Sequence, residues 1–471
     1  MTEPRAESRT EDAFGSLPLP PAVLENLQRL GYERMTPIQA ASLPLALAGK
    51  DLIAQAKTGS GKTAAFALPL LANLNPRRFA VQSLVLCPTR ELADQVTQEI
   101  RRLARAEDNI KVLTLCGGAT MRPQIASLEH GAHVVVGTPG RILDHLARET
   151  LALDALNTLV LDEADRMLDM GFAEDIANVV KHCPKDRQTL LFSATYPDDV
   201  STLAGRYLRD PQTVKLTERH SATQIRQRFY EVKEDERLHA VGLLLNHYRP
   251  ASTLAFCNTK QQCRDLVAVL QAQGIEALEL HGDLDQRDRD QVLVQFANRS
   301  CCVLVATDVA ARGLDIDRLE AVINVDITPD IEVHTHRIGR TGRMSQTGSE
   351  QGWAFSLASL DEMGRVGRID AMQGRASEFH PLAELTPKDA TVLHAPMVTL
   401  QILGGRKEKI RAGDVLGALT KDHGFAADQI GKINVNEFST YVAVARDIAA
   451  DALRKLDAGK VKGKSVKVRR L

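Results

Sequence analysis

The chain carries at residues 56–63 the stretch Ala56-Lys57-Thr58-Gly59-Ser60-Gly61-Lys62-Thr63, between an apolar run at 52–54 and a helix-like segment at 64–71. A glycine-rich loop between a strand and a helix binds phosphate, because its backbone N–H groups and the positive end of the helix face the phosphate oxygens. In such a loop Lys62 contacts the β- and γ-phosphates, and the Thr63 hydroxyl ligates Mg²⁺. The first position is Ala56, where the usual pattern has glycine. The stretch predicts a nucleotide site that includes Thr58, Gly59, Ser60, Gly61, Lys62 and Thr63.

A second segment supplies the carboxylates that such a site needs. The apolar run at 159–161 leads directly into Asp162-Glu163-Ala164-Asp165. A buried strand that ends in two carboxylates places them at the carboxyl edge of a parallel sheet, where ligands bind in α/β proteins. Asp162 is suited to hold Mg²⁺, partly through water, and Glu163 to orient and deprotonate the attacking water. Either carboxylate alone is typical of a solvated strand end, but together with the phosphate loop they predict hydrolysis of a nucleoside triphosphate.

Residues 162–165 spell Asp-Glu-Ala-Asp, and the chain resembles the DEAD-box RNA helicases from about residue 14 to residue 357. Upstream, Phe14 and the stretch 31–39 resemble the Q motif of that family. The resemblance implies that Gln39 hydrogen-bonds adenine and selects ATP, with Tyr32 and Arg34 against the base. It also implies that Asp315 contacts the ribose.

Further motifs of the family follow in order along the chain. The resemblance implies RNA contacts by Pro88, Thr89, Arg90, Gly117, Gly118, Thr138, Pro139, Gly140 and Arg141 in the first domain, and by Arg289, Thr307 and Arg312 in the second. It implies that ATP binding is coupled to strand separation through Asp165, Ser193, Thr195 and His336.

Arg340 and Arg343 close the set, in His336-Arg337-Ile338-Gly339-Arg340-Thr341-Gly342-Arg343. Two arginines three apart share one face of a helix, and such a pair is usually a solvated surface. The flanking glycines and His336 favour function here. By the resemblance both arginines stabilise the charge that builds on the γ-phosphate during hydrolysis.

Apolar runs alternate with helix-length segments in both halves of the chain, which predicts two parallel sheets. Their continuous apolar character predicts strands buried on both faces. We expect an α/β protein with two tandem RecA-like domains, at 14–215 and 224–385, and a small α+β domain at 390–471. Residues 1–13 are expected to be a flexible N-terminus and 216–223 a linker. ATP is expected between the two RecA-like domains, so that closure completes the site.

Composition fits this organisation. The chain has 471 residues, of which 44% are hydrophobic and 25% charged, as in globular proteins. No apolar run reaches membrane-spanning length, and the N-terminus does not read as a signal peptide, so a cytoplasmic location without membrane contact is expected. The seven cysteines form no Cys-x-x-Cys pair, which indicates free thiols rather than a metal site.

The last 82 residues differ from the rest in charge. Residues 390–471 hold 15 lysines and arginines against 8 aspartates and glutamates, a net charge of +7, which leaves −8 for the remainder of a chain whose total is −1. Strands are expected at 398–402, 429–435, 439–445 and 465–468, and helices at 411–420 and 448–456. The order β-α-β-β-α-β is that of an RNA-recognition motif. A basic module on a slightly acidic body indicates a domain that targets nucleic acid.

The aromatic pair that usually stacks bases on such a sheet is poorly represented, with only Phe438 and Tyr441 near the expected position. RNA contact by Arg406, Lys407, Lys409 and Arg411 is the favoured alternative to a solvated loop. The tail resembles the C-terminal domain of a bacterial branch of the DEAD-box family that recognises a hairpin of 23S ribosomal RNA. That resemblance implies a monomeric helicase acting on 23S rRNA and pre-50S particles, with ATP and Mg²⁺. A DEAD-box helicase of broad RNA range and an ATP-gated RNA clamp or annealing factor are the alternatives.

Overall fold

The computed structural model describes residues 13–56, 60–107, 109–215, 225–311, 319–342, 344–345, 348–349, 352–389 and 391–471. The described helices and strands divide into two compact units, one ending with β7 (Gln212–Lys215) and the other beginning with β8 (Ile225–Glu231). The predicted linker at 216–223 lies outside the described residues.

The first unit is built on a seven-stranded sheet in the order β3-β4-β2-β5-β6-β1-β7, in which every neighbouring pair is parallel. Its other strands are β1 (Leu52–Gln55), β2 (Ser83–Leu86), β3 (Val112–Leu115), β4 (Val134–Gly137), β5 (Thr158–Leu161) and β6 (Gln188–Ser193). Every residue of β2, β4, β5 and β6 is buried. The prediction of a parallel sheet buried on both faces is confirmed.

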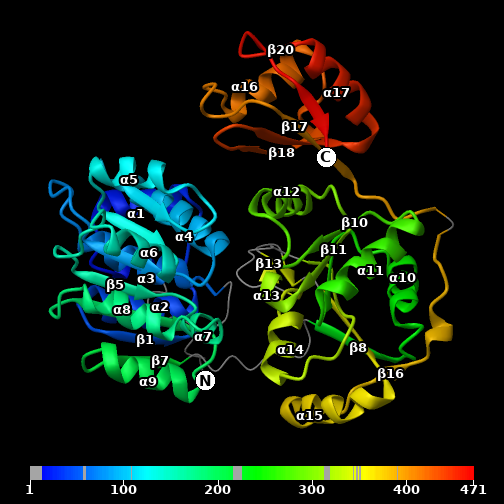
Figure 1. Ribbon diagram of the computed structural model, residues 1–471, viewed down its shortest axis with the longest axis horizontal. Coiled ribbons are helices and arrows are strands. Elements are labelled where there is room, and N and C mark those ends of the chain that lie inside the picture. Colours follow the sequence, from blue (N-terminus) through cyan, green and yellow to red (C-terminus); the bar gives the residue numbers. More distant parts are fainter. Residues whose placement is uncertain are drawn as a thin grey trace, which may run out of the picture. The chain divides into compact units, whose positions relative to one another are not determined.

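Helices cover both faces of this sheet (Figure 1). One core contains apolar residues of α1 (Pro21–Arg29), α2 (Pro37–Leu47), α3 (Lys62–Ala72) and α4 (Arg90–Leu103). The other contains residues of α6 (Pro139–Ala147), α7 (Ala164–Asp169), α8 (Ala173–Lys181) and α9 (Asp198–Tyr207), with α5 (Met121–Glu129) at its margin. The sheet is thus held rigidly between two apolar layers.

The second unit contains another seven-stranded parallel sheet, in the order β10-β11-β9-β12-β15-β8-β16. Its strands after β8 are β9 (Thr253–Cys257), β10 (Ala277–Leu280), β11 (Val303–Thr307), β12 (Ala321–Asn324), β15 (Gly352–Ala358) and β16 (Phe379–His380). Its helices are α10 (Arg237–Tyr248), α11 (Lys260–Ala272), α12 (Gln286–Ala297), α13 (Asp308–Ala311), α14 (Ile331–Ile338) and α15 (Met363–Gln373). Two short strands, β13 (Met344–Ser345) and β14 (Gly348–Ser349), form an antiparallel pair.

The C-terminal domain belongs to the same unit and has the predicted order of elements. A four-stranded antiparallel sheet, β18-β19-β17-β22, is formed by β17 (Met397–Ile402), β18 (Ile430–Val435), β19 (Thr440–Ala445) and β22 (Val468–Arg470). Helices α16 (Ala412–Gly417) and α17 (Ala449–Ala458) pack on one face of this sheet.

The predicted last strand at 465–468 is wrong in position. Residues there follow a hairpin of β20 (Lys460–Val461) and β21 (Lys464–Ser465), and the strand that joins the sheet begins at Val468. The predicted helix at 411–420 is also divided, because α16 ends at Gly417 and a π-helical turn occupies Ala418–Asp422.

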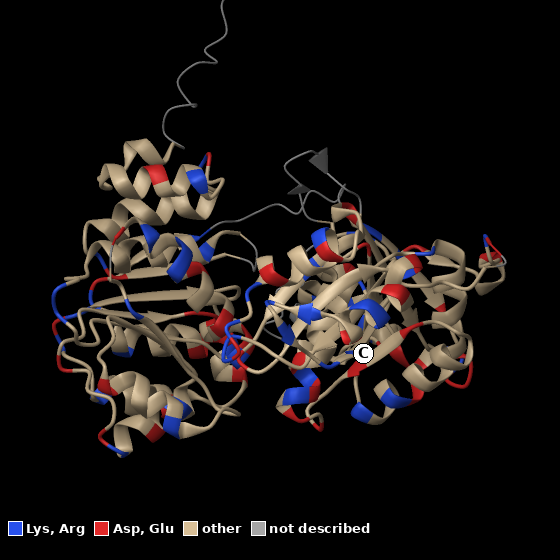
Figure 2. Cartoon of the chain, turned by 90° about the horizontal axis from the view of Figure 1, so that it is seen from above, with Lys and Arg blue, Asp and Glu red and all other residues tan. Residues whose placement is uncertain are grey.

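The described surface is polar and mixed in sign. Lysines, arginines, aspartates and glutamates lie mainly on helices and loops (Figure 2). All seven cysteines are buried free thiols, as predicted. Within the described ranges, no helix has the length and apolarity needed to cross a membrane, and no cluster of three metal-binding side chains is found.

Candidate functional site

The predicted phosphate loop leads into α3, whose first residue is Lys62. Gly61 precedes it with φ of 91°, a left-handed conformation that suits glycine. The Lys62 side chain is buried, and its Nζ has no hydrogen-bond partner among the described residues. A buried ammonium without a hydrogen-bond partner is costly, so an anion that accepts hydrogen bonds from it would stabilise the site. The residues therefore fit a phosphate group; Thr58 and Gly59 lie outside the described residues.

The acidic segment directly follows β5, as predicted. Asp162 and Glu163 are 3% and 2% exposed. Burial and the neighbouring Glu163 raise the pKa of Asp162 to about 7, although Lys62 acts in the opposite direction. A carboxyl group held near neutrality in this way gains from a cation beside it, which fits the predicted role in holding Mg²⁺ together with Thr63.

Glu163 is held in an unusual backbone conformation. Its φ is 52°, in the left-handed region that costs a residue with a side chain about 1–2 kcal/mol. Its carboxylate lies 3.0 Å from the buried Arg166 guanidinium, close enough for an ion pair but without the alignment of a good hydrogen bond. Arg166 was not predicted. Arg166 lies three residues after Glu163, and this spacing, which brings two side chains together on a helix, was the signal in the sequence that could have identified the pair.

Asp165 joins the start of α7 to the end of β6. Its Oδ2 accepts hydrogen bonds from the backbone of Ala194 (3.2 Å) and from the backbone and hydroxyl of Thr195 (2.8 and 2.9 Å). Its own N–H donates to Ser193 Oγ at 3.3 Å. Burial would raise the pKa of Asp165, but Lys62 and the bonds from Thr195 and Ser193 lower it below its ordinary value. The predicted coupling residues of this domain are therefore in direct contact.

Gln39 lies beside the phosphate loop, within α2. Its Oε1 accepts from the backbone of Thr36 at 2.9 Å, and its Nε2 donates to Gly61 O at 3.0 Å. A methyl group on Gly61 would lie 2.5 Å from Gln39 Nε2. The amide thus supports the loop, a role that the sequence did not predict, and it keeps one N–H and one lone pair for a ligand.

Tyr32 and Arg34, the other two residues predicted to contact the base, differ in exposure. Tyr32 is half-buried: its hydroxyl donates to Glu99 at 2.5 Å, and its ring meets Phe14 edge to face. Arg34 is exposed.

The predicted RNA motifs of the first domain come directly after neighbouring strands. Pro88-Thr89-Arg90 follow β2, Gly117-Gly118 follow β3, and Thr138 to Arg141 follow β4. Because β3, β4 and β2 are adjacent and parallel, these segments lie at one edge of the sheet. Arg141 donates to Ala119 O and Gln124 Oε1, both at 3.0 Å, which ties two of the segments together.

In the second domain, Arg340 is 6% exposed and follows α14, while Arg343, Arg312 and Asp315 lie outside the described residues. Thr307 ends β11, and Arg289 donates to Ala310 O at 2.8 Å. His336 lies on α14.

The sequence did not identify the pair that fixes α14. Arg337, 1% exposed, makes two hydrogen bonds of 2.7 Å to Asp308 and further bonds to Asp326 O and Asn258 Oδ1. Opposite charges in two neighbouring motifs were the available signal. This pair ties the helix that leads to Arg340 to the segment that follows Thr307.

The predicted basic cluster of the C-terminal domain, Arg406, Lys407, Lys409 and Arg411, is exposed throughout. Its loop is bonded to the turn at 436–437, since Arg406 N donates to Asn436 O and Lys407 N to Glu437 O. The adjoining Phe438 is 61% exposed, and Lys407 Nζ lies 4.2 Å from its ring centroid. Lys462 and Lys464, from the basic stretch 460–470 for which the sequence left RNA contact and a generic basic tail equally open, extend the cluster through bonds to Lys409 O and Glu408 O.

Tyr441 differs from Phe438. It is 5% exposed, and its hydroxyl accepts a hydrogen bond from Gln401. The cluster therefore presents cations and one aromatic ring on a hydrogen-bonded loop at one end of the sheet, while Tyr441 offers no open face.

Comparison with known proteins agrees with this geometry. Family models match residues 36–203 (DEAD/DEAH box helicase), 236–345 (helicase conserved C-terminal domain) and 399–470 (DbpA RNA binding domain). The ATP-dependent RNA helicase DbpA of Escherichia coli (strain K12) is 52% identical over 461 residues, which are 98% of this chain and 99% of that protein. The DbpA of Bacillus subtilis (strain 168) is 38% identical over 95% of this chain and 96% of its own length.

Among solved structures, S. cerevisiae Dbp5 bound to RNA and ADP BeF3 is similar with a TM-score of 0.72 and 31% identity, over 79% of this chain and 96% of that chain. The chain belongs to the DEAD-box ATP-dependent RNA helicases. Its C-terminal domain and its similarity along nearly the whole chain make it a helicase of the DbpA type.

Proposed function

We propose that this helicase acts on ribosomal RNA, and that its C-terminal domain binds a hairpin of 23S rRNA and directs local unwinding during assembly of the 50S subunit. The observation that carries the proposal is the exposed basic cluster with Phe438, on a domain that matches the DbpA RNA binding domain. Cations at the edge of a folded module bind the phosphates of a folded RNA, and an exposed ring stacks on an unpaired base.

In the proposed chemistry, Lys62 binds the β- and γ-phosphates of ATP, and Gln39 and the Gly61 backbone keep the loop in shape. Thr63 and Asp162 hold Mg²⁺, which supplies charge neutralisation on the phosphates. Glu163, positioned by Arg166, accepts the proton of the attacking water. Arg340 and Arg343 stabilise the charge of the transition state.

Strand displacement distinguishes a helicase from an ATP-gated RNA clamp. With ATP the protein is expected to release the short strand of a duplex flanked by the rRNA hairpin, and to turn over repeatedly. A clamp or annealing factor would bind the same duplex under ATP without repeated release.

ATPase stimulation distinguishes the rRNA helicase from one of broad range. Full-length rRNA and its isolated hairpin are expected to stimulate hydrolysis at much lower concentration than unrelated RNA. Equal stimulation by all three would favour the broad-range alternative.

A further inference from the structure

One face of the C-terminal sheet is covered by the second helicase domain. Val398, Leu400 and Ile402 of β17 point into the core of the C-terminal domain, so Thr399 lies on the opposite face. Thr399 is nevertheless only 1% exposed. Its hydroxyl receives a hydrogen bond from Asn298 Nδ2 at 3.1 Å and lies 2.7 Å from Ser300 Oγ. The face on which RNA-recognition motifs stack bases is thus used here, at Thr399, for contact with another domain.

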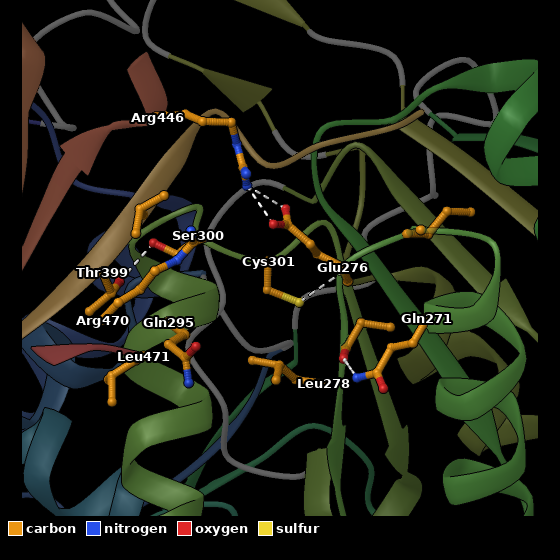
Figure 3. Close-up of a pocket in the computed structure, with 14 residues that line it drawn as sticks. Gln271, Glu276, Leu278, Gln295, Ser300, Cys301, Thr399, Arg446, Arg470 and Leu471 are labelled. Atoms are coloured by element: carbon orange, nitrogen blue, oxygen red, sulfur yellow. Dashed lines mark hydrogen bonds and ion pairs between the residues drawn. The ribbon is translucent and has the colours of Figure 1, made fainter. Parts of the chain in front are cut away.

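An ion pair between Glu276 of the helicase domain and Arg446 of the C-terminal domain fixes the same contact. Both oxygens of Glu276 lie 2.6 Å from Arg446 Nη2 (Figure 3), and Arg446 Nε donates to Ala395 O at 2.6 Å. Glu276 also accepts from Ala395 N at 2.8 Å. Charge-assisted hydrogen bonds of this kind fix orientation as well as adding energy. We call Glu276, Asn298, Ser300, Thr399 and Arg446 the junction.

The junction is polar and incompletely filled. A cavity of about 320 Å³ lies beside it, lined from the helicase domain by Gln295 and Leu278 and from the C-terminal domain by Arg470 and Leu471 (Figure 3). An interface of hydroxyls and one ion pair around a cavity resembles contacts between domains that can separate, and not a continuous apolar core. Specific polar contacts therefore contribute to the orientation, together with Leu393 and Ala395 of the connecting segment, which are buried in the core of the helicase domain.

The connecting segment is held along the helicase domain as well. Arg249 donates to Thr391 O at 2.8 Å, His247 Nδ1 lies 2.9 Å from Thr386 O, and Lys388 N donates to Asn246 O. The C-terminal domain is therefore positioned by its sheet face and by the segment that leads to it, while the basic cluster stays exposed.

We propose that the junction holds the C-terminal domain in one orientation on the second helicase domain, and that this orientation converts RNA binding at the basic cluster into stimulated ATP hydrolysis. The inference rests on the proposed function. A flexible tether alone raises the local concentration of bound RNA, but a fixed domain also presents the adjoining RNA strand in one direction. Loss of the junction should leave RNA bound to the cluster and reduce its effect on turnover.

The test is a charge reversal on the helicase side, Glu276→Arg, which places two cations together without removing one from the RNA-binding domain. The maximal ATPase rate at saturating rRNA is expected to fall about tenfold, within the roughly 5- to 150-fold size of typical coupling between sites. Direct binding of a labelled rRNA hairpin, measured by fluorescence anisotropy, should change less than about twofold, because the cluster is untouched. The double variant Glu276→Arg with Arg446→Glu restores the pair in reverse and should return most of the stimulation.

Asp186→Arg is the matched control, since it makes the same charge change in an exposed ion pair with Arg209, outside the junction. A wild-type response in Glu276→Arg would overturn the proposal, and so would a failure of the double variant to regain stimulation. Deletion of residues 397–471, which keeps Leu393 and Ala395 in the helicase core, tests the proposed function separately from the junction. If the deletion removes the rRNA preference and Glu276→Arg leaves the stimulation unchanged, only the junction proposal fails; if the deletion leaves the preference intact, the proposed function fails.

Discussion

At the scale of single residues, Glu163 is the group on which hydrolysis should depend most. Glu163→Gln keeps the shape of the side chain and leaves Asp162 in place, but an amide cannot accept the proton of water. Steady-state ATPase is expected to fall by about 10²- to 10⁴-fold, the usual cost of losing a general base, while ATP and RNA still bind. Glu174→Gln, an exposed carboxylate on α8, is the control. Near-normal turnover in the Glu163 variant would remove this residue from its proposed role.

Gln39 has two proposed roles, reading adenine and supporting the phosphate loop, and the response of the protein to GTP distinguishes them. The free N–H and lone pair of its amide match the acceptor N7 and the donor N6–H of adenine, whereas guanine presents acceptors at both N7 and O6. Gln39→Ala should weaken discrimination against GTP and also loosen the loop at Gly61, to which Nε2 donates at 3.0 Å. The measurement is kcat/KM for ATP and for GTP, with the exposed Gln28→Ala as control. If wild-type protein hydrolyses GTP as well as ATP, Gln39 does not read adenine and only supports the loop.

At the scale of elements, the contact between α7 and the end of β6 is expected to join ATP binding to strand separation. Thr195→Val removes the hydroxyl that donates to Asp165 at 2.9 Å but keeps the backbone bond of 2.8 Å. ATPase should persist within a few-fold, while strand displacement per ATP falls. An unchanged ratio of displacement to hydrolysis would contradict the coupling role. Thr202→Val, on α9, provides the same chemical change away from the contact.

The carboxylate of Asp165 should also make the stability of the folded protein depend on pH. The pKa of Asp165 is lowered in the folded protein by Lys62 and its hydrogen bonds, against the effect of burial. A depressed pKa contributes stability above the unfolded value near about 4, and this contribution is lost as pH falls through the folded value. Asp165→Asn should therefore flatten the acid side of a plot of unfolding free energy against pH. An unchanged acid limb would show that Asp165 does not supply this dependence.

Several elements were predictable because their signals are local. Continuous apolar runs such as 159–161 predicted buried parallel strands, and the phosphate loop was recognisable from its glycines. The last strand was placed too early because Lys460–Val461 and Lys464–Ser465 form a hairpin of their own. Contacts between distant positions left weaker signals or none. Glu276 and Arg446 are 170 residues apart and lie in no motif, and Arg337 and Asp308 meet only because their strands and helices fold to one sheet edge.

At the scale of the whole molecule, we expect RNA recognition and ATP hydrolysis to be separable. Arg406→Ala with Lys407→Ala removes two exposed cations from the cluster and should raise the rRNA concentration needed for half-maximal ATPase. Each lost phosphate contact should also lower the slope of log affinity against log salt by roughly 1. Lys421→Ala with Arg454→Ala removes two exposed cations from elsewhere on the same domain and should have little effect. Equal losses in both pairs would indicate a general charge effect.

The most direct measurement titrates ribosomal RNA and random RNA against ATPase rate, at one fixed salt concentration, for the full chain and for a chain lacking residues 397–471, which keeps Leu393 and Ala395 in the helicase core. All predicted ATP-site residues lie before the deleted segment, so RNA-stimulated ATPase should survive the deletion. The full chain should respond to ribosomal RNA at much lower concentration than to random RNA. The shortened chain should respond to both alike, and only at higher concentration. A shortened chain that keeps the preference for ribosomal RNA would show that the C-terminal domain does not direct the helicase to its substrate.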